Sequence, residues 1–353
     1  MQLTLLIPEL IWPEPDDNDT LDDLACPALL TLLARSRLSR RDPQSLEATL
    51  TDLFGHGENA PYAAFRLLGE ADDVWETGNK HWLCADPVHL RLLQERVVLA
   101  DSRQFGIELD EAQILAAALN EHLGDACRFH VATADRWYLQ VNDAALQITL
   151  DTPPLSAATG RNVERLLPET TEARPLRKLH TETQMLLHAH PLNTARETAG
   201  RMPINSLWFW GAGRLPARND EETSRFDGVW SINPLATGLA RAAGVPTHPL
   251  PVALANFLEH AVPESGHLIV VEDLLAPVQY ENGADYRTTI ADLERRWFDP
   301  LRAALLAGKI RQLRIEAPTA YAVLSWESRR SDQFKLWRRA QTLQALAGEL
   351  AKP

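Results

Sequence analysis

Hydrophobic residues recur along the chain in short runs whose spacing alternates between that of a strand and that of a helix. Residues 3–7 form an apolar run of strand length, and the leucines of residues 29–33 predict a helix for which Asn18, Asp19 and Thr20 offer caps. Further helices are predicted at residues 45–54 and 61–68. Near the C-terminus, residues 284–307 place large apolar side chains on one stripe of a long helix. These are Ile290, Leu293, Trp297, Leu301 and Leu305.

The order of the elements predicts the class of the fold. Strands at residues 204–210, 229–232 and 268–271 alternate with helices at 235–243 and 252–260, which is typical of a parallel sheet with helices on its faces. Before them lies a block of different type. It contains a strand at 97–99, an amphipathic helix at 109–123, and strands at 128–131 and 137–141 that are expected to form an antiparallel pair. A third strand at 146–150 and a helix that carries residues 185–187 follow. The sequence therefore predicts an α/β chain with a parallel-sheet core, residues 1–70 and 188–353, and an inserted, smaller α+β domain, residues 71–187.

Composition narrows the partners that this chain is expected to have. The formal net charge is −13, from 48 acidic residues against 35 Lys and Arg, which makes nucleic acid an unlikely general partner. No apolar run approaches the roughly 20 residues of a membrane helix, so no membrane association is expected. The acidic N-terminal segment is unlike a secretory signal, and the three widely spaced cysteines are expected to be free thiols. Both features predict a cytoplasmic protein.

One basic, aromatic stretch near the C-terminus departs from the acidic background. It is a candidate surface site formed by Arg329, Arg330, Lys335, Arg338 and Arg339, with Phe334 and Trp337 between them. Two interpretations stay open. The stretch is either the solvated face of a terminal helix or a site for phosphate or for a partner.

Three short motifs suggest chemistry only weakly. The Gly211-Ala212-Gly213 turn after a strand resembles part of a dinucleotide loop, but Pro216 stands where the third glycine belongs. His180, His188 and His190 lie close in sequence without a carboxylate or cysteine that would complete a metal shell. Trp208 and Trp210 share one face of a strand, where they serve either as core or as a stacking wall.

A longer motif carries a family resemblance. His190-Pro191-Leu192-Asn193, followed by Arg196, Gly200, Asn205, Gly211 and Gly213, resembles the pattern of archaeal-type, cofactor-independent phosphoglycerate mutases of the alkaline-phosphatase-like superfamily. Over its whole length the chain also resembles bacterial RpfE-type regulatory proteins. The resemblance implies an alkaline-phosphatase-like parallel-sheet core with an inserted domain, in agreement with the order of the elements.

The resemblance also implies what an active mutase would need. Mutases of this type hold two divalent metals through Asp and His ligands and use a serine nucleophile. Here the first strand ends in Ile7-Pro8-Glu9 rather than Asp-Gly, and Ala60-Pro61 stands where Ser-Asp is expected. The late metal motifs are also missing near residues 272–273 and 316–321. We therefore expect a catalytically inactive, phosphoglycerate-mutase-like protein without metal or cofactor, which acts as a regulatory protein by binding an unknown protein partner or a small ligand.

The resemblance places the former phosphate pocket in a candidate cleft. Its lining is expected to include Arg136, Trp137, His190, Asn193, Arg196, Asn205 and Trp210. Asn193 and Asn205 have a second interpretation, in which they satisfy backbone groups. 

Two rival functions remain. A divergent metal-dependent phosphomutase or phosphatase would use Glu9, Asp16 or Asp17, His190 and His267. A nucleic-acid accessory factor would use the basic C-terminal stretch.

Overall fold

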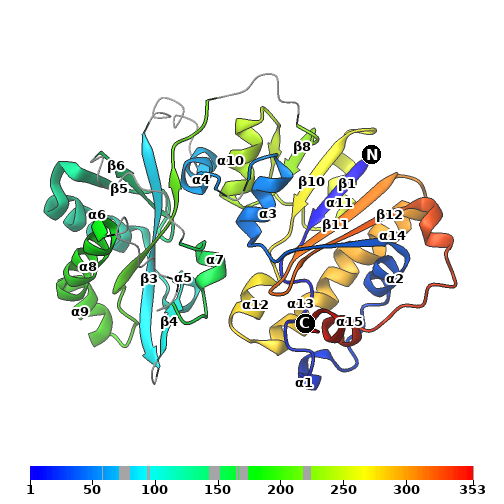
Figure 1. The fold of residues 1–353 in the computed structure, drawn as a ribbon, viewed down its shortest axis with the longest axis horizontal. Helices are drawn as coiled ribbons and strands as arrows, with labels where there is room; N and C mark the ends of the chain where they lie inside the picture. Colours follow the sequence, from blue (N-terminus) through cyan, green and yellow to red (C-terminus); the bar gives the residue numbers. More distant parts are fainter. Residues whose placement is uncertain are drawn as a thin grey trace. The chain divides into compact units, whose positions relative to one another are not determined.

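The computed structural model describes residues 1–57, 59–70, 80–93, 96–142, 152–163, 166, 174–217 and 224–352. The chain forms two compact units (Figure 1). The first unit consists of Met1–Gly55 and Asp220–Pro353, and the second unit consists of His56–Asn219. The predicted insert, residues 71–187, lies within the second unit. That unit also includes a helix before the predicted insert (Tyr62–Glu70), and a helix (Pro191–Thr198) and a strand (Ser206–Gly213) after it.

The first unit is built on a seven-stranded sheet with the order β2-β12-β11-β1-β10-β8-β9. β1 lies in the middle and runs parallel to both neighbours, β10 and β11. β8 and β9 continue the parallel part, while β12 and β2 are antiparallel additions at the other edge. The predicted parallel-sheet core is therefore confirmed. The strands are β1 (Gln2–Leu6), β2 (Arg37–Arg41), β8 (Gly228–Trp230), β9 (Thr247–His248), β10 (Gly266–Val270), β11 (Gln312–Pro318) and β12 (Val323–Arg329).

One face of this sheet is covered by a helical layer that buries the predicted apolar stripe. α13 (Gly283–Leu293), a π-helical turn (Glu294–Phe298) and α14 (Asp299–Leu306) form the predicted long helix. Their stripe packs in one core with the leucines of α2 (Pro27–Arg35) and with the inward-facing residues of the strands. Figure 1 shows α3 (Leu46–Leu53) and α10 (Pro234–Ala242) on the other side of the sheet.

The start of α2 differs from the prediction. Asn18, Asp19 and Thr20 do not cap it, because they belong to a short helix of their own, α1 (Asn18–Leu21), which Asp17 caps. α2 begins after Cys26, with Pro27 in its first turn, where a missing N–H costs nothing. The N–H groups of Ala28 and Leu29, in the first turn of the helix, instead donate to the carboxylate of Glu294, at 2.6 and 3.0 Å. A distant side chain thus does the work of a local cap.

The predicted basic terminal helix is wrong. After β12 the chain forms a 3-10 turn (Arg330–Phe334) and then runs without a helix until α15 (Leu343–Leu350). Asp332 closes the turn, because its carboxylate accepts from the Arg329 N–H at 2.8 Å and pairs with Lys335 at 2.6 Å. The aromatic residues of the stretch, Phe334 and Trp337, are exposed, so no apolar face is available to hold a helix against the core.

The second unit has its own, mainly antiparallel sheet around β3 (His81–Leu93). β3 pairs with β4 (Arg96–Ala100), β6 (Trp137–Val141) and β7 (Ser206–Gly213), and β6 pairs with β5 (Cys127–Val131). The predicted β5–β6 pair is confirmed. The placement of residues 204–210 in the parallel core is wrong, because β7 runs antiparallel to β3. β7 is buried on both faces, and such strands read as the continuous apolar runs of a parallel sheet.

The helices of the second unit follow the predictions more closely. α6 (Leu109–Leu123) has the predicted bounds, and Glu108 and Glu111 form a capping box at its start. The helix that carries residues 185–187 is α8 (Arg174–Ala189). The predicted strand at residues 146–150 lies outside the described residues. The other helices of the chain are α4 (Tyr62–Glu70), α5 (Ser102–Phe105), α7 (Leu155–Ala158), α9 (Pro191–Thr198), α11 (Leu254–His260) and α12 (Leu275–Gln279).

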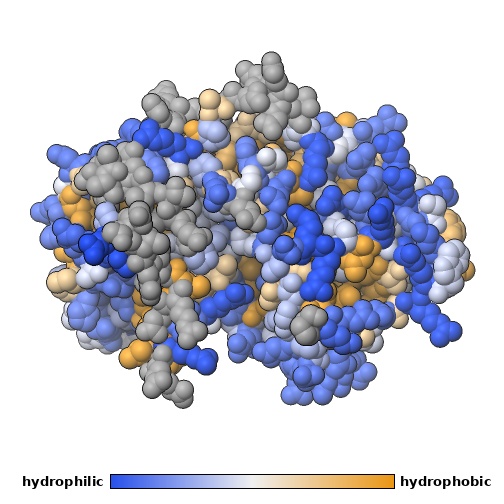
Figure 2. All heavy atoms as spheres, in the orientation of Figure 1, coloured by the Kyte–Doolittle hydropathy of each residue, from blue (hydrophilic) through white to orange (hydrophobic). Residues whose placement is uncertain are grey.

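No helix in the described part of the chain combines the length and the apolar character that crossing a membrane requires. Hydrophilic side chains predominate on the face of the first unit that Figure 2 shows, and hydrophobic ones form smaller, separate areas.

The two glycines of the Gly211-Ala212-Gly213 motif allow β7 to approach the first turn of α4. A Cβ atom at Gly211 would lie 2.9 Å from the Cβ of Tyr62 and 3.2 Å from the backbone nitrogen of Ala63. A Cβ atom at Gly213 would lie 2.6 Å from the Cβ of Pro61. The backbone of Gly211 also has φ +66°, which disfavours other residues. The motif therefore serves the packing of β7 against the start of α4.

We expect Gly211→Ala to destabilise the protein by about 1–3 kcal/mol, because the new methyl group meets backbone and Cβ atoms that cannot rotate away. Urea unfolding, followed by circular dichroism, measures the change. The control is Gly57→Ala, since a Cβ at Gly57 meets nothing within 4 Å. Equal stability of Gly211→Ala and the unmodified protein would show that the close approach is not needed.

Candidate functional site

The parallel strands of the first unit define one edge at which their carboxyl ends meet. In open α/β sheets, ligands bind outside this edge. The chain leaves the strands here through Glu9, Ser231, Glu272, Asp273 and Thr319. Glu9 has φ +56°, and its N–H donates to the carbonyl of Pro318 at 2.9 Å, which ties the end of β1 to the end of β11.

Several polar groups at this edge are used to brace the turns that follow the strands. The hydroxyl of Ser231 accepts from the Asn233 N–H at 2.9 Å, and the hydroxyl of Thr319 donates to the Ala322 carbonyl at 2.9 Å. Asp273 pairs with Arg296 at 3.2 Å. These contacts fix the backbone at the edge.

Arginines surround the carboxylate of Glu316 near the edge. Glu316 is fully buried on β11, two residues before the end of the strand. Its carboxylate accepts from Arg41 of β2 and, at 2.7 Å, from Arg314 of the same strand. Arg41 also reaches Asp52 of α3 at 3.3 Å. We call Arg41, Arg225, Arg314 and Glu316 the guanidinium cluster.

The electrostatics of the guanidinium cluster favour an anion. Burial lowers the pKa of Arg225, and the positive charge of Arg314 lowers it too; Glu316 opposes this shift, whereas Arg41 adds to it. The side chains of Arg41 and Arg314 are 40% and 26% exposed, so solutes can reach them. Guanidinium groups bind phosphate and carboxylate through paired, charge-assisted hydrogen bonds. The cluster is thus suited to hold a phosphate group.

Within the first unit, the residues expected for a metal site are not brought together. Asp17 caps α1 by accepting from the Thr20 N–H at 3.1 Å, and Asp16 is exposed. His267 lies at the amino end of β10, opposite the carboxyl edge, where its Nε2 is 2.6 Å from the hydroxyl of Ser265. His190 belongs to the second unit.

The donors that are present do not fit the metal pair that the resemblance implies. No group of three His, Cys, Asp or Glu side chains that could hold a metal ion occurs within the described ranges. Glu316 and Asp273, near the carboxyl edge, are already paired with arginines. No chemical step is therefore assigned to a metal.

The other histidines considered for a metal serve local roles in the second unit. The Nε2 of His180 lies 3.1 Å from the hydroxyl of Ser206, and burial lowers the pKa of this histidine. His190 caps α9, because its Nδ1 accepts from the Leu192 N–H at 3.2 Å. His188 is exposed.

Two residues of the candidate cleft, Arg136 and Trp210, belong to a buried charge network within the second unit. Arg66 of α4 forms two hydrogen bonds with Asp86 of β3, at 2.8 and 2.7 Å, and a third with the hydroxyl of Tyr138, at 2.8 Å. The indole of Trp210 donates to Asp86 at 2.9 Å. Burial alone would lower the pKa of Arg66, but the Asp86 carboxylate raises it well above its usual value.

Arg136 joins the same network from the start of β6. Its guanidinium binds the carboxylate of Glu70 on α4 at 2.5 and 3.1 Å, and Glu70 also accepts from the hydroxyl of Tyr138 at 3.0 Å. Burial raises the pKa of Tyr138 well above its usual value, so the hydroxyl is a neutral partner. Arg136 and Trp210 are thus brought together, as members of one hydrogen-bonded chain.

Trp137 lies on the other face of the sheet. Cys84 is paired with both Tyr138 and Trp210, so these side chains share one face, and Trp137, the neighbour of Tyr138, points the opposite way. It packs in the core against α6 and α8, and its indole donates to the Ala134 carbonyl at 2.9 Å. The sheet therefore separates two tryptophans that were expected to line one cleft.

The two asparagines of the candidate cleft form hydrogen bonds with backbone groups. Asn193 bonds the carbonyls of Leu187 and Ile204 and the N–H of Ile204, all within 2.8 Å. Asn205 bonds both backbone groups of Leu90 at 2.8 and 2.9 Å. The backbone-satisfying interpretation of the two asparagines is confirmed.

Arg196 is also structural. It is 2% exposed, pairs with Glu111 at 2.7 Å, and donates to the carbonyls of Phe105, Gly106 and Met202. All four of these partners lie in the second unit.

The charged residues that organise both sites were missed by the sequence analysis. Asp86 and Glu316 each stand directly between apolar residues of a strand, in the segments LCADPV and RIEAP. A buried carboxylate must find a cationic partner. A single acidic residue between apolar residues of a strand was therefore a sign of a buried ion pair.

Comparison with known proteins supports the fold and the enzyme family. Residues 88–193 match the family model of 2,3-bisphosphoglycerate-independent phosphoglycerate mutase. A mutase of that name from Methanosarcina mazei is 27% identical over 202 residues, which are 54% of this chain and 49% of the relative. A probable mutase of the same kind from Geobacter sulfurreducens is 27% identical over 217 residues, 60% of this chain and 54% of the relative. The chain thus spans about half the length of these curated relatives.

A solved structure shares the fold. The PH0037 protein from Pyrococcus horikoshii superposes with a TM-score of 0.56 over 98% of this chain and 91% of its own, at 15% identity. The predicted fold class, a parallel-sheet core with a smaller α+β part, is confirmed. The chain is phosphoglycerate-mutase-like, and the RpfE-type resemblance stays a prediction.

The expectation of a catalytically inactive regulatory protein is wrong. The family model and the curated relatives carry the name of an enzyme. The alternative, a divergent phosphomutase or phosphatase, agrees with them better. The error came from giving the missing motifs more weight than the similarity of the rest of the chain.

Removing the negative charge of Asp86 should destabilise the protein strongly. In Asp86→Asn the Arg66 guanidinium stays buried without a counter-charge, and we expect a loss of about 3–5 kcal/mol in the free energy of unfolding. Urea unfolding measures it. The matched control, Asp125→Asn, changes an exposed aspartate of the same unit and should alter stability by less than about 0.5 kcal/mol. Similar small losses in both variants would contradict a structural role for the pair.

Proposed function

We propose that this chain is a divergent phosphoryl-transfer enzyme, a phosphomutase or phosphatase that acts on small phosphorylated acids of the phosphoglycerate type. The observation that carries the proposal is the match of residues 88–193 to the phosphoglycerate mutase family model. The relatives from Methanosarcina mazei and Geobacter sulfurreducens extend the similarity over about 200 residues.

The guanidinium cluster supplies a binding group for such a substrate. It lies near the carboxyl edge of the parallel sheet in the first unit, whereas the family match lies in the second unit, so the two observations support the proposal independently. Phosphate carries two negative charges near neutral pH, and arginine stays protonated there.

The residues of the guanidinium cluster would have different roles in binding the phosphate. Arg41 and Arg314 are partly exposed and would donate to the phosphate oxygens. Glu316, which accepts from both, orients their planar groups. Burial and, after it, the charge of Arg314 lower the pKa of Arg225, and an incoming anion would stabilise the charged form of this arginine.

The test is an assay of the purified protein for interconversion of phosphoglycerate isomers and for hydrolysis of p-nitrophenyl phosphate, with Mg²⁺ or Mn²⁺ and separately with EDTA. We expect turnover of at least one substrate. Arg314→Gln should lower kcat/KM by about 10- to 100-fold, the effect of one charge-assisted hydrogen bond.

The control is Arg311→Gln, which changes an exposed arginine just before the same strand and should leave kcat/KM unchanged. Absence of turnover in every condition, with the protein folded, would reject the proposed function. Turnover that survives Arg314→Gln in full would keep the enzyme but move its phosphate site elsewhere.

A further inference from the structure

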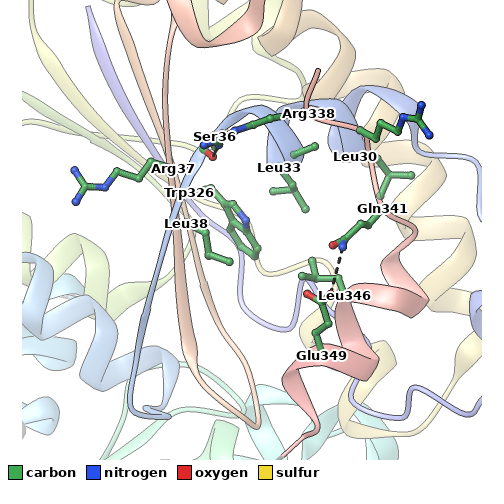
Figure 3. A pocket seen from close by; sticks show the side chains of 12 residues that line it. Leu30, Leu33, Ser36, Arg37, Leu38, Trp326, Arg338, Gln341, Leu346 and Glu349 are labelled. Carbon is green, nitrogen blue, oxygen red and sulfur yellow. Dashed lines mark hydrogen bonds between the residues drawn. The ribbon is translucent and has the colours of Figure 1, made fainter. Parts of the chain in front are cut away.

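A pocket opens on the other face of the strands that carry the guanidinium cluster. It lies between α2, the β2–β12 edge of the sheet, α15 and the chain segment that leads to α15, with a volume of about 500 Å³ (Figure 3). Ser325 of β12 pairs with Glu316, whereas the next residue, Trp326, lines the pocket. Because neighbouring residues of a strand face opposite sides, the sheet separates the pocket from the cluster.

The walls of the pocket are apolar. Leu30, Leu33, Leu38, Trp326 and Leu346 point toward its interior in Figure 3. Trp326 is nearly fully buried, but Leu38 is 46% exposed, so part of the wall is in contact with water. Exposed apolar area of this kind favours a ligand with a hydrocarbon or aromatic body.

The rim of the pocket is cationic. Arg338 extends toward Ser36, whose carbonyl accepts from its Nη1 at 2.7 Å, and this bond holds the guanidinium across one end of the pocket (Figure 3). Arg339 also contributes to the lining. The acid at the rim, Glu349, lies at the other end and accepts from the amide of Gln341 at 3.2 Å. The pocket thus has a cationic end at Arg338, an acidic end at Glu349 and apolar walls between them.

We propose that this pocket binds a small amphipathic anion, a molecule with one carboxylate head and an aliphatic or aromatic body. The head would bind the Arg338 guanidinium, whose position is already fixed by Ser36, and the body would cover Trp326 and the leucines. A fully apolar ligand would leave the guanidinium without a counter-charge, and a compact dianion would leave the apolar wall in water. The volume lies within the range of sites for small molecules.

Octanoate tests the proposal, with 1-octanol as a neutral probe of the same length. Isothermal titration calorimetry on the full chain should give saturable octanoate binding with a Kd of about 1 mM or tighter, which is reasonable for a ligand of this size. Arg338→Gln should weaken octanoate by about tenfold or more and leave octanol within about twofold. Leu346→Trp fills the pocket from a half-buried position and should abolish binding of both probes.

The matched control is Arg330→Gln, which changes an arginine of the same basic stretch that does not line the pocket. It should bind both probes like the unmodified protein. Absence of saturable octanoate binding would overturn the proposal. Equal octanoate affinity after Arg338→Gln would overturn the anionic head, and binding that persists in folded Leu346→Trp would place the ligand elsewhere. None of these outcomes depends on phosphoryl transfer.

Discussion

The buried pair of Arg66 and Asp86 is the interaction on which the arrangement of the second unit depends. Moving two charges out of water costs several kcal/mol for each ion, and only close geometry with further hydrogen bonds offsets that cost. Both conditions are met: Arg66 makes two bonds to Asp86 and one to Tyr138, and Trp210 completes the shell of the carboxylate. The four residues come from α4, β3, β6 and β7, so all four elements must keep their positions for the pair to persist.

The arginines of the Arg66–Asp86 network and those around Glu316 are buried to different extents. In the second unit the Arg66 side chain is only 8% exposed beside Asp86, and Arg136, which is partly exposed, pairs with Glu70. In the first unit Glu316 is fully buried, but the arginines that hold it remain partly exposed. A guanidinium that is oriented by a buried carboxylate and open to water can bind a further anion, because its position is already determined. Arg66 is therefore structural, whereas binding of a further anion by Arg41 and Arg314 remains the proposal made above.

The sequence predicted those elements whose hydrophobic spacing and caps lie within the element itself. α6 follows from its own spacing and cap, and the stripe of residues 290–305 follows from helical periodicity. The sequence could not place β7, since a strand that is buried on both faces looks alike in parallel and antiparallel sheets. It also missed the partner of Asp86, because Arg66 lies in a helix where a single arginine is ordinarily solvent-facing. Which strand a carboxylate meets is decided by tertiary pairing, and a single sequence does not reveal it.

The edge strand β2 shows how one short segment meets several physical demands at once. Its sequence, RLSRR, leaves a charged edge at the end of the sheet, and charge at an edge opposes pairing with another molecule. Alternation along the strand then sends Arg41 to the guanidinium cluster on one face and Leu38 to the apolar pocket on the other. The guanidinium cluster and the apolar pocket, the two proposed sites, are therefore linked by the register of β2 and β12, in which Leu38 pairs with Trp326 and Ser39 with Ser325. A shift of that register by one residue would exchange the faces and remove both surfaces together.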